Sequence, residues 1–229
     1  MVFADRSDAG RRLAAALSQF REKSPVIIAL PRGGVPVAVE VAAALSAPLD
    51  LAIVRKIGVP MQPELAMGAV ADAMPPVVIR NEEVIRAAGV SQATFDAEYE
   101  RQLTEARRRR SLYLADRRPV PLAGRTAIVI DDGIATGASM RAALRSVRAG
   151  HPRRVVLAVP VATRGTLDSL RSETDDIVCL DPRDGLDAVG EFYRDFAQVQ
   201  DQEVVRAMRQ FSEAFPWPAD TPPPSASAS

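Results

Sequence analysis

The sequence predicts an α/β fold, in which helices cover both faces of a central, mostly parallel, twisted sheet. Two short, continuously apolar segments, Val26–Leu30 and Thr126–Ile130, have the pattern of strands that are buried on both sides. Each is followed by a glycine-containing loop and then by a helical segment, as in a βαβ unit. With 229 residues, of which 47% are hydrophobic, the chain can bury a sizeable core.

The first βαβ unit follows from local signals. A helix is expected over residues 10–22, because its apolar residues recur at helical spacing, and Ser24-Pro25 ends it. The strand Val26–Leu30 then leads into a turn at Pro31–Gly34. An apolar helix over Val35–Leu45 and a second strand over Leu49–Val54 complete the unit.

The middle of the chain has a different character. Glycine and proline punctuate residues 58–80, where we expect a hairpin of Met67–Asp72 with Val77–Arg80. A long helix is expected over Ser91–Leu114, and its polar side carries the run Arg107–Arg110. We interpret this run as a solvated helix face, with a basic contact for a phosphate or an acidic partner as the alternative.

The remainder repeats the alternation of strand and helix. The expected elements are a strand at Thr126–Ile130, a loop at 131–139, a helix at Met140–Ala149, a strand at Val155–Val159, a helix at Thr166–Arg171, a strand at Asp176–Leu180 and a last helix at Val199–Phe215. The Pro-, Ser- and Ala-rich stretch 216–229 is expected to be disordered.

Composition excludes several classes of site. A single cysteine, Cys179, rules out an internal disulfide framework, and a single histidine, His151, argues against a Ser-His-Asp triad and His-based metal sites. We expect both residues to be structural. No apolar run approaches 18 residues and the start is not a signal peptide, so we expect a cytoplasmic protein with no membrane partner.

The charge balance bears on partners. Lys plus Arg number 29 and Asp plus Glu number 29, so the formal net charge is zero, and we expect no nucleic acid partner. Only Lys23 and Lys56 are lysines. Nearly all basic residues of this chain are arginines, so a lysine at position 56 marks a site where an ammonium group could be required.

The most informative stretch is residues 127–140, Ala-Ile-Val-Ile-Asp-Asp-Gly-Ile-Ala-Thr-Gly-Ala-Ser-Met. Asp131 and Asp132 end an apolar strand, at the edge where α/β sheets bind ligands, and they could accept hydrogen bonds from the two hydroxyls of a ribose. The amides of residues 134–139, with the Thr136 and Ser139 hydroxyls, could form an anion cradle at a helix N-terminus. Together these features predict a site for a ribose 5-phosphate.

Other interpretations of this loop fit less well. The spacing Gly133-x-x-x-Gly137 lacks the Lys-[Ser/Thr] ending of a nucleoside triphosphate loop. Asp131-Asp132-Gly133 lacks the later ligands of a calcium loop. A plain strand-turn-helix connection would not need two adjacent acids.

In residues 127–140 the sequence resembles the type I phosphoribosyltransferases, whose signature is an apolar strand, two acids and a Gly/Thr/Ser-rich loop. Leu30-Pro31-Arg32-Gly33-Gly34 stands where that family has its pyrophosphate loop, and Arg55-Lys56 closes the second expected strand. Bacterial predicted phosphoribosyltransferases share both segments and a late motif, here Val189–Phe196. The resemblance spans about residues 24–182.

The resemblance implies a domain plan: a single phosphoribosyltransferase domain over 1–215, with a variable hood above the core. The hood would comprise an insertion at about 58–118 and a C-terminal segment at about 183–215. In the insertion Glu64 is a lesser candidate for function. In the C-terminal segment Phe192, Tyr193 and Asp195 could cover the accepting base, although packing is the plainer interpretation.

The resemblance also implies the reaction and its residues. The activity would be transfer of a phosphoribosyl group from phosphoribosyl pyrophosphate to a nucleobase or related nitrogen nucleophile. Mg²⁺ would be held mainly by substrate and water, with no direct protein ligand. The catalytic residues would be Arg32, Lys56, Asp131 and Asp132. The residues binding phosphoribosyl pyrophosphate would be Arg32, Gly33, Gly34, Arg55, Lys56, Asp131, Asp132, Gly133, Ile134, Ala135, Thr136, Gly137, Ala138 and Ser139.

Two features refine these expectations. Ala135 stands where the 6-oxopurine enzymes carry an acid, which disfavours hypoxanthine or guanine as acceptor. The pyrophosphate turn of the family often contains a cis peptide bond, which here would be Pro31–Arg32. We also expect a homodimer. The alternative function is a non-catalytic sensor of phosphoribosyl pyrophosphate or a nucleotide on the same fold, because fold alone does not separate an enzyme from a binder.

Overall fold

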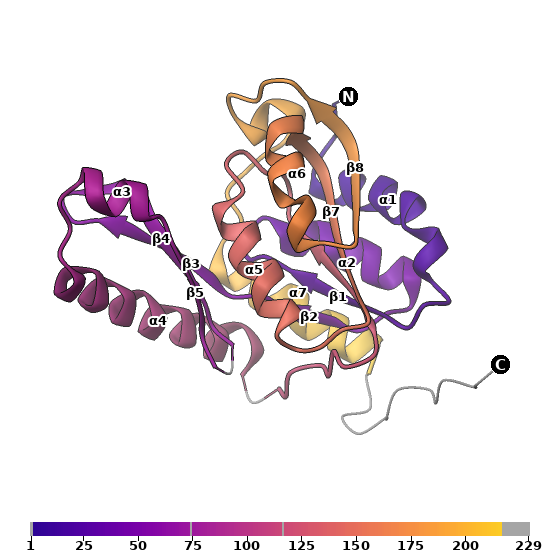
Figure 1. Cartoon of the computed structure of the whole chain (residues 1–229). Coiled ribbons are helices and arrows are strands. Elements are labelled where there is room, and N and C mark those ends of the chain that lie inside the picture. The colour runs from indigo at the N-terminus through magenta and orange to yellow at the C-terminus, as the bar shows by residue number, and fades with distance from the viewer. Residues whose placement is uncertain (1, 74, 116, 217–229) are drawn as a thin grey trace.

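A five-stranded parallel sheet forms the centre of the structure, a computed structural model that describes residues 2–73, 75–115 and 117–216 (Figure 1). The strand order is β2-β1-β6-β7-β8, and every neighbouring pair runs parallel. The predicted α/β class with a parallel sheet is therefore confirmed. The strands are β1 (Pro25–Ala29), β2 (Leu49–Leu51), β6 (Thr126–Ile130), β7 (Arg154–Thr163) and β8 (Asp176–Arg183).

Helices cover both faces of this sheet, because alternate strand residues point to opposite sides. Ile128 and Ile130 of β6 pack with α1 (Arg6–Ala16), α2 (Gly34–Leu45) and α7 (Asp201–Ala214). On the other face Ala127 and Val129 pack with α5 (Ala138–Arg148) and α6 (Arg164–Leu170). Short 3₁₀ turns connect elements at η1 (Ser18–Phe20), η2 (Arg171–Glu173) and η3 (Val189–Phe192).

A second, antiparallel sheet projects to one side of the central sheet (Figure 1). It consists of β3 (Val54–Val59), β4 (Gln62–Ala71) and β5 (Val77–Arg80). Ile57, Met67 and Phe95 are part of a separate small core between this sheet and its helices. The helices are α3 (Glu82–Ala87) and α4 (Gln92–Leu114), and Ser91 caps the latter by accepting a hydrogen bond from the Thr94 amide.

The single strand expected over Leu49–Val54 is wrong. β2 ends at Leu51, and the chain then leaves the central sheet: the Ile53 carbonyl accepts from the Asp72 amide at 2.9 Å, which starts the second sheet. Arg55 and Lys56 therefore lie in β3 and do not close a central strand. The apolar run is continuous across the break, so burial alone could not show that the partner strand changes.

Other boundaries differ by a few residues. Asp5 caps α1, which begins at Arg6 and ends at Ala16, earlier than the expected 10–22. β7 continues through Pro160 to Thr163, and β8 continues to Arg183. The predicted hairpin is confirmed by the pairing of β4 with β5. The predicted tail lies outside the described residues except for Pro216.

Within the described ranges, no helix is both long and apolar enough to cross a membrane.

Candidate functional site

The carboxylate pair lies at the carboxyl edge of the central sheet. Asp131 follows directly on β6, and its Oδ1 accepts a hydrogen bond from the Asp132 amide at 2.9 Å. Burial, reinforced by the neighbouring Asp132 charge, raises the pKa of Asp131 well above its usual range. The pair therefore combines a carboxyl group that resists ionisation with a second carboxyl group beside it.

The Pro31–Gly34 turn comes directly against this pair. A Cβ atom built on Gly33 would lie 2.0 Å from Asp132 Oδ2, and one on Gly34 would lie 2.9 Å from the Asp131 Cα atom. Two segments about 100 residues apart in the sequence therefore meet, as the resemblance implied. The Pro31–Arg32 peptide bond is cis, which confirms that prediction.

The loop after Asp132 supplies free backbone donors, with one exception. The Ile134 amide donates to the Val161 carbonyl at 3.0 Å, so Ile134 extends alongside β7 and this amide does not face a ligand. Within the described ranges, the amides of residues 135–137 donate to no other residue. They precede the N-terminus of α5, where orphan amides and the helix dipole favour anions.

Gly137 fixes the turn into α5. Its φ of 78° lies in the left-handed region, and a Cβ atom there would lie 2.9 Å from Thr166 Cγ2. Thr166 also holds the loop, since its hydroxyl donates to the Ala135 carbonyl at 2.7 Å. These contacts fix the backbone of the loop that leads into α5.

A cavity of about 740 Å³ joins this edge to the second sheet. It brings together Pro31 of the turn, Ser139 in the first turn of α5, and Arg55 and Lys56 of β3. Glu64, the lesser candidate, is also exposed at its wall. Predicted residues from three separate segments therefore line one space.

Of the two β3 cations, Arg55 has the side chain that is held by a hydrogen bond. Its side chain donates to Gln102 Oε1 at 3.1 Å, whereas Lys56 is exposed. Burial, and then the nearby Arg109 charge, lower the pKa of Arg55. Arg109 belongs to the run that we interpreted as a solvated face, yet it lines the same cavity. This position fits the alternative interpretation, a basic contact for a phosphate or an acidic partner.

Arg32 has a different partner from the one expected. Its guanidinium lies 3.5 Å from an Asp201 carboxylate oxygen at the start of α7, and it does not line the cavity. The Tyr113 hydroxyl donates to the same oxygen at 2.6 Å, and burial followed by this bond raises the pKa of Tyr113 to about 12. Arg32 would have to exchange Asp201 for a ligand in order to act as a charge acceptor.

Sequence reasoning missed Arg6, which holds the carboxylate pair from α1. Its Nε donates to Asp132 Oδ2 at 2.7 Å, and both side chains are nearly nine-tenths buried. Its Nη1 donates to the Ala197 carbonyl at 2.8 Å, and its guanidinium stacks 3.9 Å from the centre of the Phe196 ring. A terminal helix arginine carries no motif that would mark it.

We expect Arg6→Ala to lower the free energy of unfolding by about 1.5–3 kcal/mol, the range for a hydrogen bond to a charged group. It should also weaken ligand binding by leaving Asp132 without its fixed donor. Denaturant unfolding and calorimetry measure the two effects. Arg11→Ala is the matched control, because Arg11 lies on the same helix, is exposed and pairs loosely with Glu40 at 3.5 Å. Equal effects of the two changes would contradict the role of Arg6.

The C-terminal hood candidates are mainly packing residues. Tyr193 is buried against Phe3, with ring centres 5.3 Å apart, and its hydroxyl donates to the Asp132 carbonyl at 2.6 Å. Asp195 Oδ1 accepts from the Ala197 amide, and Phe192 packs beside the same cluster. Tyr193 therefore contacts the site through the backbone carbonyl of Asp132.

The two residues expected to be structural are consistent with that role. His151 occupies a turn with φ of 54°, where its carbonyl accepts from the Gly124 amide. Cys179 lies in β8 and is half-buried, and burial raises the pKa of its thiol.

The described residues offer few side chains that could bind Mg²⁺ directly. Among the residues described, no three His, Cys, Asp or Glu side chains are grouped so that they could hold a metal ion. Asp131 and Asp132 offer hard oxygen atoms at the edge of the site, which suits an ion that keeps its waters. These residues fit a hydrated ion that arrives with a substrate.

Comparison with solved structures agrees with this fold. The crystal structure of the protein TT1426 from Thermus thermophilus is 40% identical, with a TM-score of 0.78 over 92% of this chain and 99% of that one.

Sequence relatives point to the same family. Two Mycobacterium tuberculosis proteins, "Putative phosphoribosyl transferase MT0597" of strain CDC 1551 / Oshkosh and "Putative phosphoribosyl transferase Rv0571c" of strain ATCC 25618 / H37Rv, are each 45% identical over 227 residues. The match covers 97% of this chain, which spans about half (51%) of their length. The model of the phosphoribosyl transferase domain matches residues 4–182. The chain therefore belongs to the phosphoribosyl transferase domain family.

Proposed function

We propose that this chain transfers a phosphoribosyl group from phosphoribosyl pyrophosphate to a ring nitrogen of a nucleobase or a related nucleophile, and releases pyrophosphate. One observation carries the proposal: the Pro31–Gly34 turn lies directly against Asp131 and Asp132, and a single cavity joins this turn to the start of α5 and to β3. This arrangement supports separate places for a diol, two anionic groups and an acceptor.

The ribose and its 5-phosphate have the most fixed partners. Asp131 and Asp132 would accept hydrogen bonds from the two ribose hydroxyls. The free amides of residues 135–137, at the start of α5, would bind the 5-phosphate. Because these donors are held by Gly137 and Thr166, they need no reorganisation when the ligand arrives.

Pyrophosphate would lie between the turn and β3. As the bond from C1 to pyrophosphate breaks, negative charge develops on the leaving group, and Arg55 and Lys56 at the cavity wall would stabilise it. Arg32 would join them after leaving Asp201. Mg²⁺, when bound with the substrate, would neutralise part of the pyrophosphate charge; Asp131 and Asp132 are the residues that fit its waters.

The acceptor would occupy the rest of the cavity. About 740 Å³ exceeds what the pyrophosphate contacts need and lies within the usual range for small-molecule sites. Ala135 offers no side-chain acid to an acceptor, and its carbonyl is engaged by Thr166. This supports an acceptor other than hypoxanthine or guanine.

The test is pyrophosphate release from phosphoribosyl pyrophosphate and Mg²⁺ across a panel of nucleobases and related heterocycles. We expect release with at least one acceptor at a rate at least about tenfold above that without acceptor, and loss of that release in Lys56→Ala. Tight binding of phosphoribosyl pyrophosphate with no release for any acceptor would support the sensor function instead. Arg21→Ala, an exposed change away from the cavity, is the control.

A further inference from the structure

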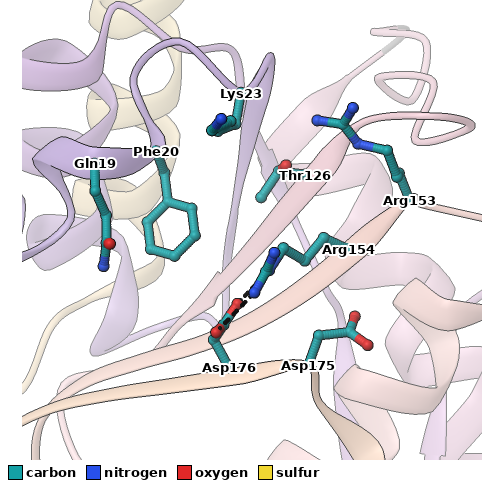
Figure 2. Close-up of a pocket in the computed structure, with 8 residues that line it drawn as sticks. All are labelled: Gln19, Phe20, Lys23, Thr126, Arg153, Arg154, Asp175 and Asp176. Atoms are coloured by element: carbon teal, nitrogen blue, oxygen red, sulfur yellow. Dashed lines mark hydrogen bonds and ion pairs between the residues drawn. The ribbon is translucent and has the colours of Figure 1, made fainter.

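A second cavity lies at the opposite, amino edge of the central sheet. Its volume is about 600 Å³, and Figure 2 shows its lining. Thr126, Arg154 and Asp176 come from the starts of β6, β7 and β8. The 3₁₀ turn η1 and the residues after it close the other wall with Gln19, Phe20 and Lys23.

Thr126 supplies a buried polar atom at this cavity. The residue has no exposed surface, and its Oγ1 has no hydrogen-bond partner among the described residues. A buried hydroxyl left unpaired costs about 1–3 kcal/mol. Such an atom in the lining of a cavity points to a ligand that would complete its hydrogen bonding.

The cations around Thr126 divide into paired and unpaired groups. Arg154 is neutralised by Asp176, with Nη2 3.0 Å from Oδ1, and Asp175 is neutralised by Arg148 at 3.0 Å. Within the part of the chain that the structure describes, Lys23 and Arg153 form no ion pair. Figure 2 shows these two on either side of Thr126.

We propose that this cavity binds a phosphate monoester of a small organic molecule, with Lys23, Arg153 and the Thr126 hydroxyl holding the phosphate. A phosphate monoester carries a charge close to −2 at neutral pH, which matches two unpaired cations. A carboxylate would leave one of them uncompensated. Lys23 is one of only two lysines in the chain, and the other lines the first cavity.

The organic part of the ligand has its own surface. The cavity is far larger than a phosphate group requires and falls within the range of small-molecule sites. The Phe20 ring offers an apolar wall, and the Gln19 amide offers both donors and an acceptor. Phosphate alone would leave these contacts unused.

This cavity is separate from the site proposed above. β6 runs from Thr126 at one cavity to Ile130, just before Asp131, at the other; five residues in a strand span roughly 17 Å. Of the residues that the structure describes, none lines both cavities. The two proposals therefore stand or fall independently.

The test uses the full chain and ribose 5-phosphate as the probe, with amide NMR signals as the readout. We expect saturable shifts of the Thr126, Arg154 and Asp176 signals. The double change Lys23→Gln and Arg153→Gln should weaken this binding at least tenfold. The matched control, Arg21→Gln with Arg118→Gln, removes the same charge from two exposed positions outside the cavity and should leave it unchanged.

Parallel titrations with inorganic phosphate and acetate define the ligand class. Both should bind at least tenfold more weakly than ribose 5-phosphate at these signals. Equal binding of inorganic phosphate, equal binding of acetate, or an unchanged affinity in the Lys23/Arg153 variant would overturn the proposal. Shifts confined to residues 131–139 would overturn it as well, while supporting the first site.

The variant Thr126→Val tests whether the Thr126 hydroxyl contributes to ligand binding or to the stability of the fold. Valine has nearly the same shape and removes only the unpaired hydroxyl, so we expect the Tm to stay the same or rise. Binding of ribose 5-phosphate at this cavity should weaken about 10- to 100-fold, corresponding to one hydrogen bond to a charged group. A marked fall in Tm, or unchanged affinity, would contradict the assigned role of Thr126.

Discussion

Replacing Asp131 and Asp132 together by asparagine is expected to weaken binding of phosphoribosyl pyrophosphate by about 100- to 10,000-fold while leaving the fold intact. Two hydrogen bonds to the ribose hydroxyls are affected, and each contributes between about 1 kcal/mol, for a neutral acceptor, and about 3 kcal/mol, for a charged one. Asparagine keeps the shape of aspartate, so the turn at Gly33 and Gly34 still has the close neighbours that it has now. Titration calorimetry measures the affinity.

The stability of the single variant Asp131→Asn provides a second, opposite readout. Burial raises the pKa of Asp131, so its folded pKa lies above the unfolded value. Such a group lowers stability as the pH rises from its ordinary pKa through the raised one, because the unfolded chain releases its proton first. Asp131→Asn removes that penalty. The single variant should therefore be at least as stable as the parent at neutral pH, and more stable relative to it at pH 8 than at pH 4.

Unchanged affinity in the double variant would refute the assignment of the diol site. A loss of affinity with a matching loss of the folded state would not count in its favour, so circular dichroism accompanies the calorimetry. Asp184→Asn with Asp187→Asn, in the loop after β8, is the matched control for loss of two negative charges.

The central sheet was predictable because two of its inner strands are buried along their whole length. Thr126–Ile130 is buried at every position, and so is β1, which makes the apolar runs continuous and unambiguous. The second sheet was only partly predictable. β3 has mixed burial, and only two residues separate it from the end of the central strand β2, so the sequence contains no signal of where one sheet ends and the next begins.

The candidate site divides in the same way. Asp131, Asp132 and the loop after them are contiguous, so they form a recognisable motif. Arg6 and Asp201 come from helices near the two ends of the chain and reach the site only through the packing of α1 and α7. No local pattern distinguishes them from the many surface arginines and aspartates.

The second large effect is expected for Gly33→Ala, which should weaken binding of phosphoribosyl pyrophosphate by about 100-fold. The backbone of Gly33 has φ of −61° and ψ of −35°, which any residue adopts, so conformational freedom does not require glycine here. The close approach does: the added Cβ would lie 2.0 Å from Asp132 Oδ2, a carboxylate that Arg6 holds at 2.7 Å. Either the carboxylate or the turn must move, and a displacement of about 1 Å in a positioned group can cost about 100-fold.

Two further variants decide whether this contact is the cause. Gly185→Ala is the matched control, because a Cβ there meets nothing within 4 Å; its affinity should equal that of the parent. Adding Asp132→Ala to Gly33→Ala removes the obstructing carboxylate, and we expect the double variant to regain Tm relative to Gly33→Ala alone without regaining affinity. Recovery of affinity would mean that Asp132 is dispensable for binding. Parent-like affinity in Gly33→Ala would mean that the turn and the carboxylate pair do not form one site.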